Sequence, residues 1–283
     1  DDDNWAQYDI MVLTGAPVKH PMEELLEKAA EFFAKYPKQE LFNRGLRDGV
    51  TIAPVATLED VLGFDHLEAR NYWYDYELPG GRKVRIPGVF ARPGRTPLHA
   101  PGPAPMDADP APAARPALGP LPAARPGRLP FEGLKVADFS WIGVGPISAK
   151  YFADHGATVV RVETTNPPDR LRNAGPFKDG VAGVNRSQFV GMANSSKKGG
   201  VLDLKSAAGK KVAKQLLAWC DVAFESFTPG TMADLGLGYE VAKALNPEII
   251  MVSTCLMGQT GPARSLAGFG YHAAAIAGFY EIT

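Results

Sequence analysis

The chain has 283 residues, of which 45% are hydrophobic and 22% are charged. These proportions are typical of a globular protein and exclude a disordered chain. Lysine and arginine number 30 against 31 aspartate and glutamate residues, so the net charge is -1 and the clustered basic surface of a nucleic-acid-binding protein is not expected.

Residues 1–92 are predicted to form a small α+β segment. Apolar residues recur at helical spacing over 21–35, and further helices are expected over 39–47 and, with Thr57 as its cap, over 58–62. Thr51–Val55 reads as a short edge strand, because Pro54 has no N–H to donate to a second neighbour. Residues 72–78 and 82–86 flank a Pro-Gly-Gly turn and predict a β-hairpin.

Residues 93–130 carry nearly half of the 25 prolines, mixed with alanine, glycine and arginine. Proline fixes φ and lacks a backbone donor, and this stretch offers few large apolar side chains to bury. We expect an extended linker that separates residues 1–92 from residues 131–283.

Residues 131–283 alternate between apolar strands and helices. Strands are expected over 134–139, 158–163, 201–204, 221–227 and 248–255, and helices over 147–155, 206–219 and 268–277, with another opening at Pro229. This alternation is typical of a Rossmann-like parallel sheet with helices on both faces.

The two cysteines, Cys220 and Cys255, are too few for a disulfide framework and lack zinc-ligand spacing. No apolar run approaches the ~20 residues that span a bilayer, and the first residues do not read as a signal peptide. We therefore expect a cytoplasmic protein with no metal, membrane or nucleic-acid partner. Both ends look cut, which predicts a fragment of a longer chain.

The first strand–turn–helix of the second block is the natural ligand site. Gly143 and Gly145 give an incomplete dinucleotide-binding pattern, and Glu163 stands where a ribose-binding acid would lie, so an NAD(P)-dependent oxidoreductase remains an alternative. The lysines of 197–205 could hold phosphates, although a solvated basic loop is the simpler interpretation.

The second block also carries an ordered series of motifs that resembles the CaiB/BaiF family of class III CoA-transferases. The motifs are Gly133–Ser140, Gly145-Pro146, Asp154–Glu163, Asn194-x-x-Lys197-Lys198, Leu202–Lys205, Asp221-Val222 with Glu225–Gly230, Leu235–Tyr239, Leu245–Pro247 and Gly258–Pro262. Residues 49–88 resemble the last third of the same family. The order is thus tail, linker and head, which predicts the junction of a tandem fusion of two copies, with a circular permutant as the alternative.

The resemblance implies CoA transfer between an acyl-CoA and a carboxylic acid through an aspartyl-CoA intermediate, and an interlocked homodimer or intrachain pseudo-dimer. Coenzyme A enters as the acyl-CoA substrate, and no metal is implied. The CoA-contact positions carried over from the motifs are Trp141, Ile142, Leu202, Lys205, Ser226, Phe227 and Leu235.

The sequence departs from the family pattern at several positions. The nucleophilic aspartate is expected beyond Thr283, so no catalytic residue is assigned within the chain. Gly270 stands at a position that is usually acidic, Thr164 and Asp234 replace residues that are often basic, and Gly143 replaces a common turn residue. These departures leave open a non-catalytic, CoA-binding or scaffold copy within a tandem transferase.

Overall fold

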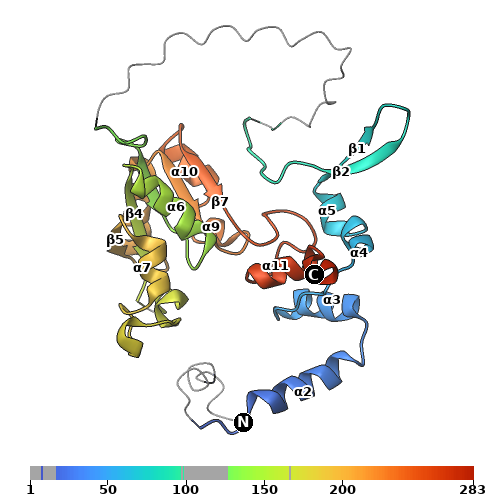
Figure 1. Cartoon of the computed structure of the whole chain (residues 1–283). Coiled ribbons are helices and arrows are strands. Elements are labelled where there is room, and N and C mark those ends of the chain that lie inside the picture. Colours follow the sequence, from blue (N-terminus) through green and yellow to red (C-terminus); the bar gives the residue numbers. More distant parts are fainter. Residues whose placement is uncertain (1–7, 9–16, 97, 99–126, 166) are drawn as a thin grey trace. The chain divides into compact units, whose positions relative to one another are not determined.

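The computed structural model describes residue 8 and residues 17–96, 98, 127–165 and 167–283 (Figure 1). These residues belong to two compact units: the described part up to Gly63 together with Gly268–Thr283, and Phe64–Ala267. Most of the proline-rich segment 93–130 lies outside the described residues, so its extended course stays a prediction.

The first unit is helical. It contains α2 (Met22–Phe33), α3 (Lys38–Asp48), α4 (Leu58–Leu62), α11 (Gly270–Ile276) and α12 (Phe279–Ile282). Helix α4 begins with reciprocal capping, in which the Asp60 N–H donates to Thr57 Oγ1 at 3.2 Å and the Thr57 N–H donates to Asp60 Oδ2 at 2.7 Å. The helices expected over 21–35, 39–47 and 58–62 are therefore confirmed.

The prediction of a strand over Thr51–Val55 is wrong, because this segment pairs with no other strand in the described part of the chain. Pro54 removes one backbone donor, and the next N–H after the segment, that of Ala56, donates to the carbonyl oxygen of Ala275 in α11 at 3.0 Å. The end of this segment is thus fastened to a helix, and its β-branched residues do not decide its conformation.

The second unit is built on a parallel sheet of five strands. The strands are β3 (Lys135–Asp138), β4 (Thr158–Glu163), β5 (Lys198–Val201), β6 (Val222–Glu225) and β7 (Ile250–Ser253), in the spatial order β5-β4-β3-β6-β7. Every neighbouring pair is parallel, as in Val136 beside Val159 and Ala137 beside Ala223. The Rossmann-like α/β class predicted from the sequence is confirmed.

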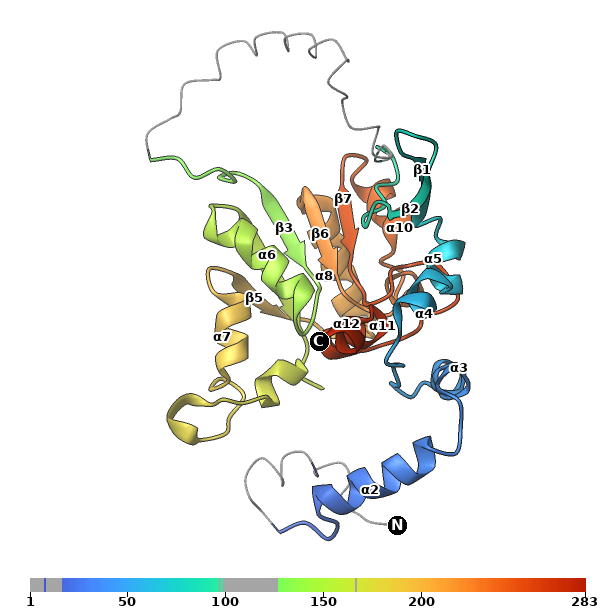
Figure 2. The same ribbon diagram turned by 45° about the vertical axis from the view of Figure 1, so that its right-hand side comes forward.

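Helices cover both faces of this sheet. Helix α6 (Val144–Asp154) packs its alanines against Val136 and Val159 on one face. On the opposite face, Ala137 and Phe139 lie in a cluster with residues of α8 (Ala207–Trp219), α9 (Thr231–Asp234) and α10 (Tyr239–Leu245). Figure 2 shows α6 and α8 on opposite sides of β3 and β6. Successive strand residues face opposite ways, so each short strand supplies both cores.

The third strand lies earlier than expected. The sequence predicts it over 201–204, whereas β5 ends at Val201. Leu202 and Leu204 follow in a turn, where the Ser206 N–H donates to the Asp203 carbonyl oxygen at 3.1 Å. Apolar residues stand at these two positions because they pack against the buried cluster beneath α8, and not because a strand continues through them. Between β4 and β5 the chain forms the short helices η2 (Arg170–Asn173), η3 (Lys178–Gly180) and α7 (Gln188–Asn194).

The second unit also includes residues that precede the proline-rich segment. These residues form α5 (Asp65–Ala69) and an antiparallel hairpin of β1 (Trp73–Glu77) and β2 (Lys83–Pro87), which confirms the predicted hairpin. His66 is 1% exposed, and its ring lies within hydrogen-bond distance of the Met257 carbonyl oxygen, 2.8 Å, and the Ala263 N–H, 3.0 Å. The segment around α5 is therefore fastened to the loop that follows β7.

These contacts fix the protonation state of His66. Nδ1 must be unprotonated to accept the Ala263 N–H, and Nε2 must then carry the proton that it donates to Met257. Burial also lowers the pKa of His66 below its ordinary value of 6.5. An added proton would remove the acceptor for Ala263, so the contact requires neutral histidine.

We predict that His66 makes the second unit less stable in acid. Below pH 6.5 the histidine of the unfolded chain is protonated, whereas His66 of the folded chain stays neutral until its lowered pKa is reached. The stabilising contribution of His66 is therefore complete above pH 6.5 and declines as the pH falls toward the pKa of the folded state. Exchange of His66 for Gln should lower the free energy of unfolding by about 1–3 kcal/mol at neutral pH and reduce the loss between about pH 7.5 and 5.

Thermal unfolding followed across this pH range measures both effects. Exchange of the exposed His155 for Gln is the matched control and should change the free energy of unfolding at neutral pH by about 0.5 kcal/mol or less. A His66→Gln variant with the same pH dependence as the wild type would contradict the prediction.

Candidate functional site

The carboxyl edge of the sheet contains a reversal of strand order. From β3 the chain continues to β4 on one side, and it returns to β6 on the other side. In open α/β sheets, ligands bind in the crevice outside the carboxyl ends of the strands at such a point. The loops that leave β3 and β6 here carry Trp141, Ile142, Ser226 and Phe227, four of the seven residues predicted to contact CoA.

The structure brings these two loops into direct contact. The Trp141 N–H donates to Ser226 Oγ at 2.9 Å, and the same hydroxyl donates to the Trp141 carbonyl oxygen at 2.9 Å. The rings of Trp141 and Phe227 lie 6.2 Å apart between centroids. One serine side chain thus satisfies both backbone groups of Trp141 and fixes the distance between the loops.

Acidic side chains at the strand ends hold the loops in shape. Asp138 ends β3 and accepts the Ser140 N–H at 3.0 Å, and Glu225 ends β6 and accepts the Phe227 N–H at 2.8 Å. Both carboxylates are buried, and burial raises the pKa of Glu225. An acid that bonds the N–H two residues later forms a local turn, which explains why each loop bends away at once.

Of the three other residues predicted to contact CoA, two pack against the core and one is exposed. Leu202 and Leu235 pack, with Phe227, against the buried cluster that contains Phe139 and Leu237. Lys205 is exposed, and its N–H donates to Asp203 Oδ1 at 2.9 Å. Its ammonium has no partner among the described residues, so it is available to an anion.

Ile142 adopts a backbone conformation that β-branched residues rarely take. Its φ is 67°, in the left-handed region, and its N–H donates to Asp169 Oδ2 at 3.2 Å. Nothing in the local sequence signals this conformation, because Asp169 lies on a different loop.

Lys197 does not belong to a solvated basic loop, and that interpretation is wrong for this residue. Its side chain is 1% exposed, and its ammonium lies 2.7 Å from Asp138 Oδ2. Burial lowers the pKa of Lys197, against the opposing effect of the Asp138 carboxylate. Lys197 therefore neutralises a buried acid and does not face solvent as a phosphate ligand would.

Sequence reasoning also missed Arg161 and Asp169, which are 3% and 0% exposed and form an ion pair. One signal was present in the sequence. Arg161 stands among the valines of a strand predicted to be buried, and a charged residue in such a place requires a buried counter-ion.

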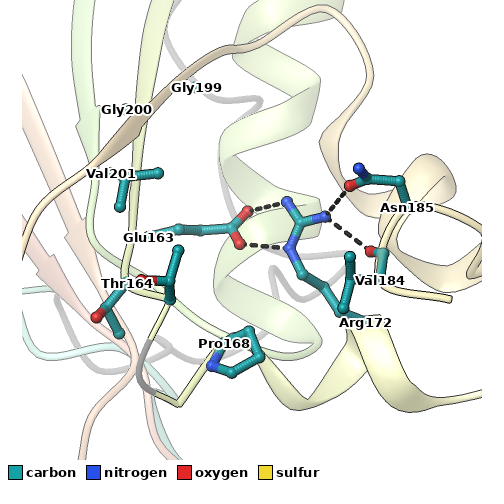
Figure 3. A pocket seen from close by; sticks show the side chains of 10 residues that line it. Glu163, Thr164, Pro168, Arg172, Val184, Asn185, Gly199, Gly200 and Val201 are labelled. Atoms are coloured by element: carbon teal, nitrogen blue, oxygen red, sulfur yellow. Dashed lines mark hydrogen bonds and ion pairs between the residues drawn. The ribbon is translucent and has the colours of Figure 1, made fainter.

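A cavity of about 370 Å³ opens at the ends of β4 and β5 (Figure 3). Its lining includes Glu163, Thr164, Arg172, Asn185, Gly200 and Val201. Arg172 meets Glu163 with two hydrogen bonds of 2.6 and 2.8 Å, and Arg161 adds one of 2.9 Å. Burial acts to raise the pKa of Glu163, but these arginines outweigh it and hold the pKa below its ordinary value.

The ion pairs of Glu163 count against the alternative that the protein is an NAD(P)-dependent oxidoreductase. Its two carboxylate oxygens accept from guanidinium groups, so this acid is not offered to a ribose. Gly145 also has a packing role, since a Cβ there would lie 2.4 Å from the Ser140 Cβ and 3.2 Å from the Ser226 Cβ. Ion pairs therefore account for Glu163 and packing accounts for Gly145, which are two of the three residues that suggested a dinucleotide site.

Of the departures from the family pattern, Gly270 and Asp234 are exposed, whereas Gly143 and Thr164 are half-buried. Gly270 is the first residue of α11 in the first unit, and a Cβ built on it meets nothing within 4 Å. Asp234 ends α9 and is exposed, and Thr164 lines the cavity beside Glu163. Gly143 caps α6.

Within the described residues, the two cysteines are both free, no group of three or more histidine, cysteine, aspartate or glutamate side chains is placed to hold a metal, and no helix has the length and apolarity needed to cross a membrane.

Comparison with known proteins identifies the family. The model of CoA-transferase family III matches residues 1–109 and 131–283. A probable CoA-transferase of Mycobacterium tuberculosis is 33% identical over 243 residues, which are 85% of this chain and 30% of that relative. The human succinyl-CoA:glutarate CoA-transferase is 36% identical over 154 residues, which are 54% of this chain and 34% of the human protein.

A crystal structure of a CAIB/BAIF family protein from Brucella suis matches with a TM-score of 0.49 and 30% identity, over 53% of this chain and 40% of that one. The family match, which covers most of the chain, shows that the chain belongs to CoA-transferase family III. The chain spans about a third of the length of the curated relatives it matches.

We predict that Gly145 is required for the two loops to meet. Exchange of Gly145 for Ala forces its Cβ to within 2.4 Å of Ser140 and should destabilise the second unit by about 1–3 kcal/mol. Gly143 is the matched control, since nothing lies within 4 Å of a Cβ there and its φ is -98°. Its exchange for Ala should change stability by about 0.5 kcal/mol or less. Equal melting temperatures for the two variants would contradict the prediction.

Proposed function

We propose that the full-length protein is a class III CoA-transferase and that this chain supplies a CoA-binding sheet edge. The observation that carries the proposal is that Leu202, Phe227 and Leu235 pack against one buried cluster of the sheet, with the ring of Trp141 6.2 Å from that of Phe227. The family match and the relatives named as CoA-transferases support the same reading. The acyl-CoA and the acceptor carboxylic acid are the substrates.

The chemistry would run through a carboxylate nucleophile, which divides one difficult transfer into easier steps. An aspartate, placed by the resemblance beyond Thr283, attacks the acyl carbonyl and releases the CoA thiolate, leaving a mixed anhydride. The thiolate attacks the aspartyl carbonyl, releases the first carboxylate and forms aspartyl-CoA. The acceptor carboxylate then displaces the thiolate, which finally attacks the acceptor carbonyl and frees the aspartate.

The residues of this chain would bind and orient CoA. The resemblance places the adenine near Thr164, which lines the cavity of about 370 Å³ at the end of β4. The Glu163–Arg172 ion pair neutralises the wall of that cavity, so an uncharged base meets no unpaired charge there. Lys205, exposed and without a described partner, is the candidate for a phosphate contact.

We also propose that the chain is the junction of two copies, with residues 1–92 as the end of copy one, residues 93–130 as the linker and residues 131–283 as the CoA-binding half of copy two. The family model matches in two segments separated by part of the proline-rich stretch. The 243 matched residues are 30% of the mycobacterial relative, and the 154 matched residues are 34% of the human relative. The mycobacterial relative is therefore nearly twice as long as the human one. That length would accommodate two copies.

A non-catalytic copy is the second candidate, and one observation favours it. Gly270 begins α11 without a carboxylate at the position that the family usually fills with an acid. Such a copy would bind CoA weakly or serve to hold its partner copy in place.

Binding of CoA tests the proposal through Lys205. If its ammonium contacts a phosphate, exchange of Lys205 for Ala should weaken CoA binding by about 1–3 kcal/mol. Calorimetry on the full-length protein, with the site of the other copy disabled, measures the affinity. The exposed Lys211 of α8 is the control, and its exchange for Ala should leave the affinity unchanged. Equal affinities for the wild type and the Lys205→Ala variant would mean that Lys205 makes no contact with CoA.

Transfer activity separates the catalytic from the non-catalytic copy. Exchange of Gly270 for Asp restores the usual acid at an open position near a helix start, where acidic residues are tolerated. A second carboxylate close to the nucleophile can raise the pKa of that nucleophile, as paired carboxylates do. We expect acyl-CoA turnover to rise several-fold in the full-length protein whose first-copy nucleophile is removed.

Exchange of Gly270 for Asn, which has the same shape without the charge, is the control and should not raise turnover. A folded Gly270→Asp variant without any gain would make the non-catalytic copy the better description.

A further inference from the structure

Four ionisable side chains lie buried beneath the loop that joins β3 to α6. Asp138 and Asp169 are 0% exposed, Arg161 is 3% exposed, and the Lys197 side chain is 1% exposed. They come from β3, from β4, from the loop after β4 and from the residue before β5. The sheet therefore gathers four distant positions under a single loop.

The four side chains pair their charges with one another. The Lys197 ammonium lies 2.7 Å from Asp138 Oδ2, Arg161 lies 3.9 Å from the same oxygen, and Arg161 also pairs with Asp169. Two negative and two positive charges thus balance within the cluster. A buried ion network of this kind seldom adds net stability over well-packed apolar side chains, so its role lies elsewhere.

That role is visible in the backbone groups that the network holds. Arg161 Nη1 donates to the Ser140 carbonyl oxygen at 3.2 Å, and Lys197 Nζ donates to the Pro146 carbonyl oxygen at 2.7 Å. Asp138 accepts the Ser140 N–H at 3.0 Å, and Asp169 accepts the Ile142 N–H at 3.2 Å. Every member of the network therefore bonds the backbone of residues 140–146.

The hydrogen bond from the Ile142 N–H to Asp169 holds a strained backbone conformation. A φ of 67° is unfavourable for a β-branched residue, and such strain persists only where the surroundings hold it. Asp169 supplies the acceptor, and its own position is set by Arg161 and by the Leu171 N–H at 2.9 Å. The strained turn carries Trp141 and Ile142 at the point where the loops after β3 and β6 meet.

We propose that Asp169 is a positioning residue for CoA binding, which holds Ile142 in the left-handed turn while Arg161 and Lys197 brace the same loop. This inference rests on the proposed CoA site. Asp169 acts through Ile142, and a loop shaped in advance loses less conformational freedom when the ligand binds.

A double-mutant cycle on CoA affinity tests the proposal. In the full-length protein with the other site disabled, exchange of Asp169 for Asn should weaken CoA binding about tenfold, because a neutral amide holds the Ile142 N–H and the Arg161 guanidinium less firmly. In an Ile142→Gly background, where positive φ carries no penalty, the same exchange should weaken binding by less than about threefold. A merely structural role for Asp169 would give the same loss in both backgrounds.

Asp179 provides the matched control. Like Asp169 it pairs with an arginine, Arg186, at 2.9 Å, but it is exposed. Its exchange for Asn should leave CoA affinity unchanged. Binding by the unmodified protein that persists undiminished in the Asp169→Asn variant would overturn the positioning role, whereas absence of CoA binding by the unmodified protein would overturn the proposed function itself.

Hydrogen exchange of the unmodified protein is a second test of the proposal, and it does not require that a variant folds. If Asp169 holds the turn in advance, the Ile142 amide is protected from exchange before CoA is added. Fast exchange of that amide in the CoA-free protein would overturn the proposal.

Discussion

The site depends on the neutralisation of Asp138 at the end of β3. A carboxylate that is 0% exposed requires a close cation, and Lys197 and Arg161 supply it from neighbouring parts of the chain. Both cations also hold carbonyl oxygens of the loop that follows β3. The same contacts that make the buried acid tolerable therefore shape the loop at which we propose that CoA binds.

The parallel sheet makes this arrangement available. Because its strands run in one direction, their last residues meet at one edge, and Asp138, Glu163 and Glu225 all occupy such ends. Each acid is engaged by a nearby backbone N–H or by arginines, so none is left as an isolated charge. At this edge Lys205 is exposed, and it is the cation that we propose for a phosphate contact.

Most of the fold could be predicted from the sequence because its signals are local. The apolar strand 158–163 coincides with β4, and Ser206 begins α8 by accepting the Gly209 N–H at 3.0 Å. The failures have non-local causes: Thr51–Val55 is fastened to a helix, and Leu202 and Leu204 are apolar for packing. The site residues Trp141 and Phe227 came from family motifs, whereas the left-handed Ile142 and the buried Lys197 depend on partners far along the chain, which spacing does not reveal.

The central claim is that the loops at the carboxyl edge of the sheet bind CoA. Hydrogen exchange of the full-length protein, with the other copy's site disabled, tests it most directly when the free and CoA-bound states are compared. The account predicts that CoA slows exchange of the amides over 140–145, 202–205 and 226–228. Protection confined to the opposite edge, where β3, β4 and β6 begin at Lys135, Thr158 and Val222, would contradict it, as would a saturating amount of CoA that protects no amide of this chain.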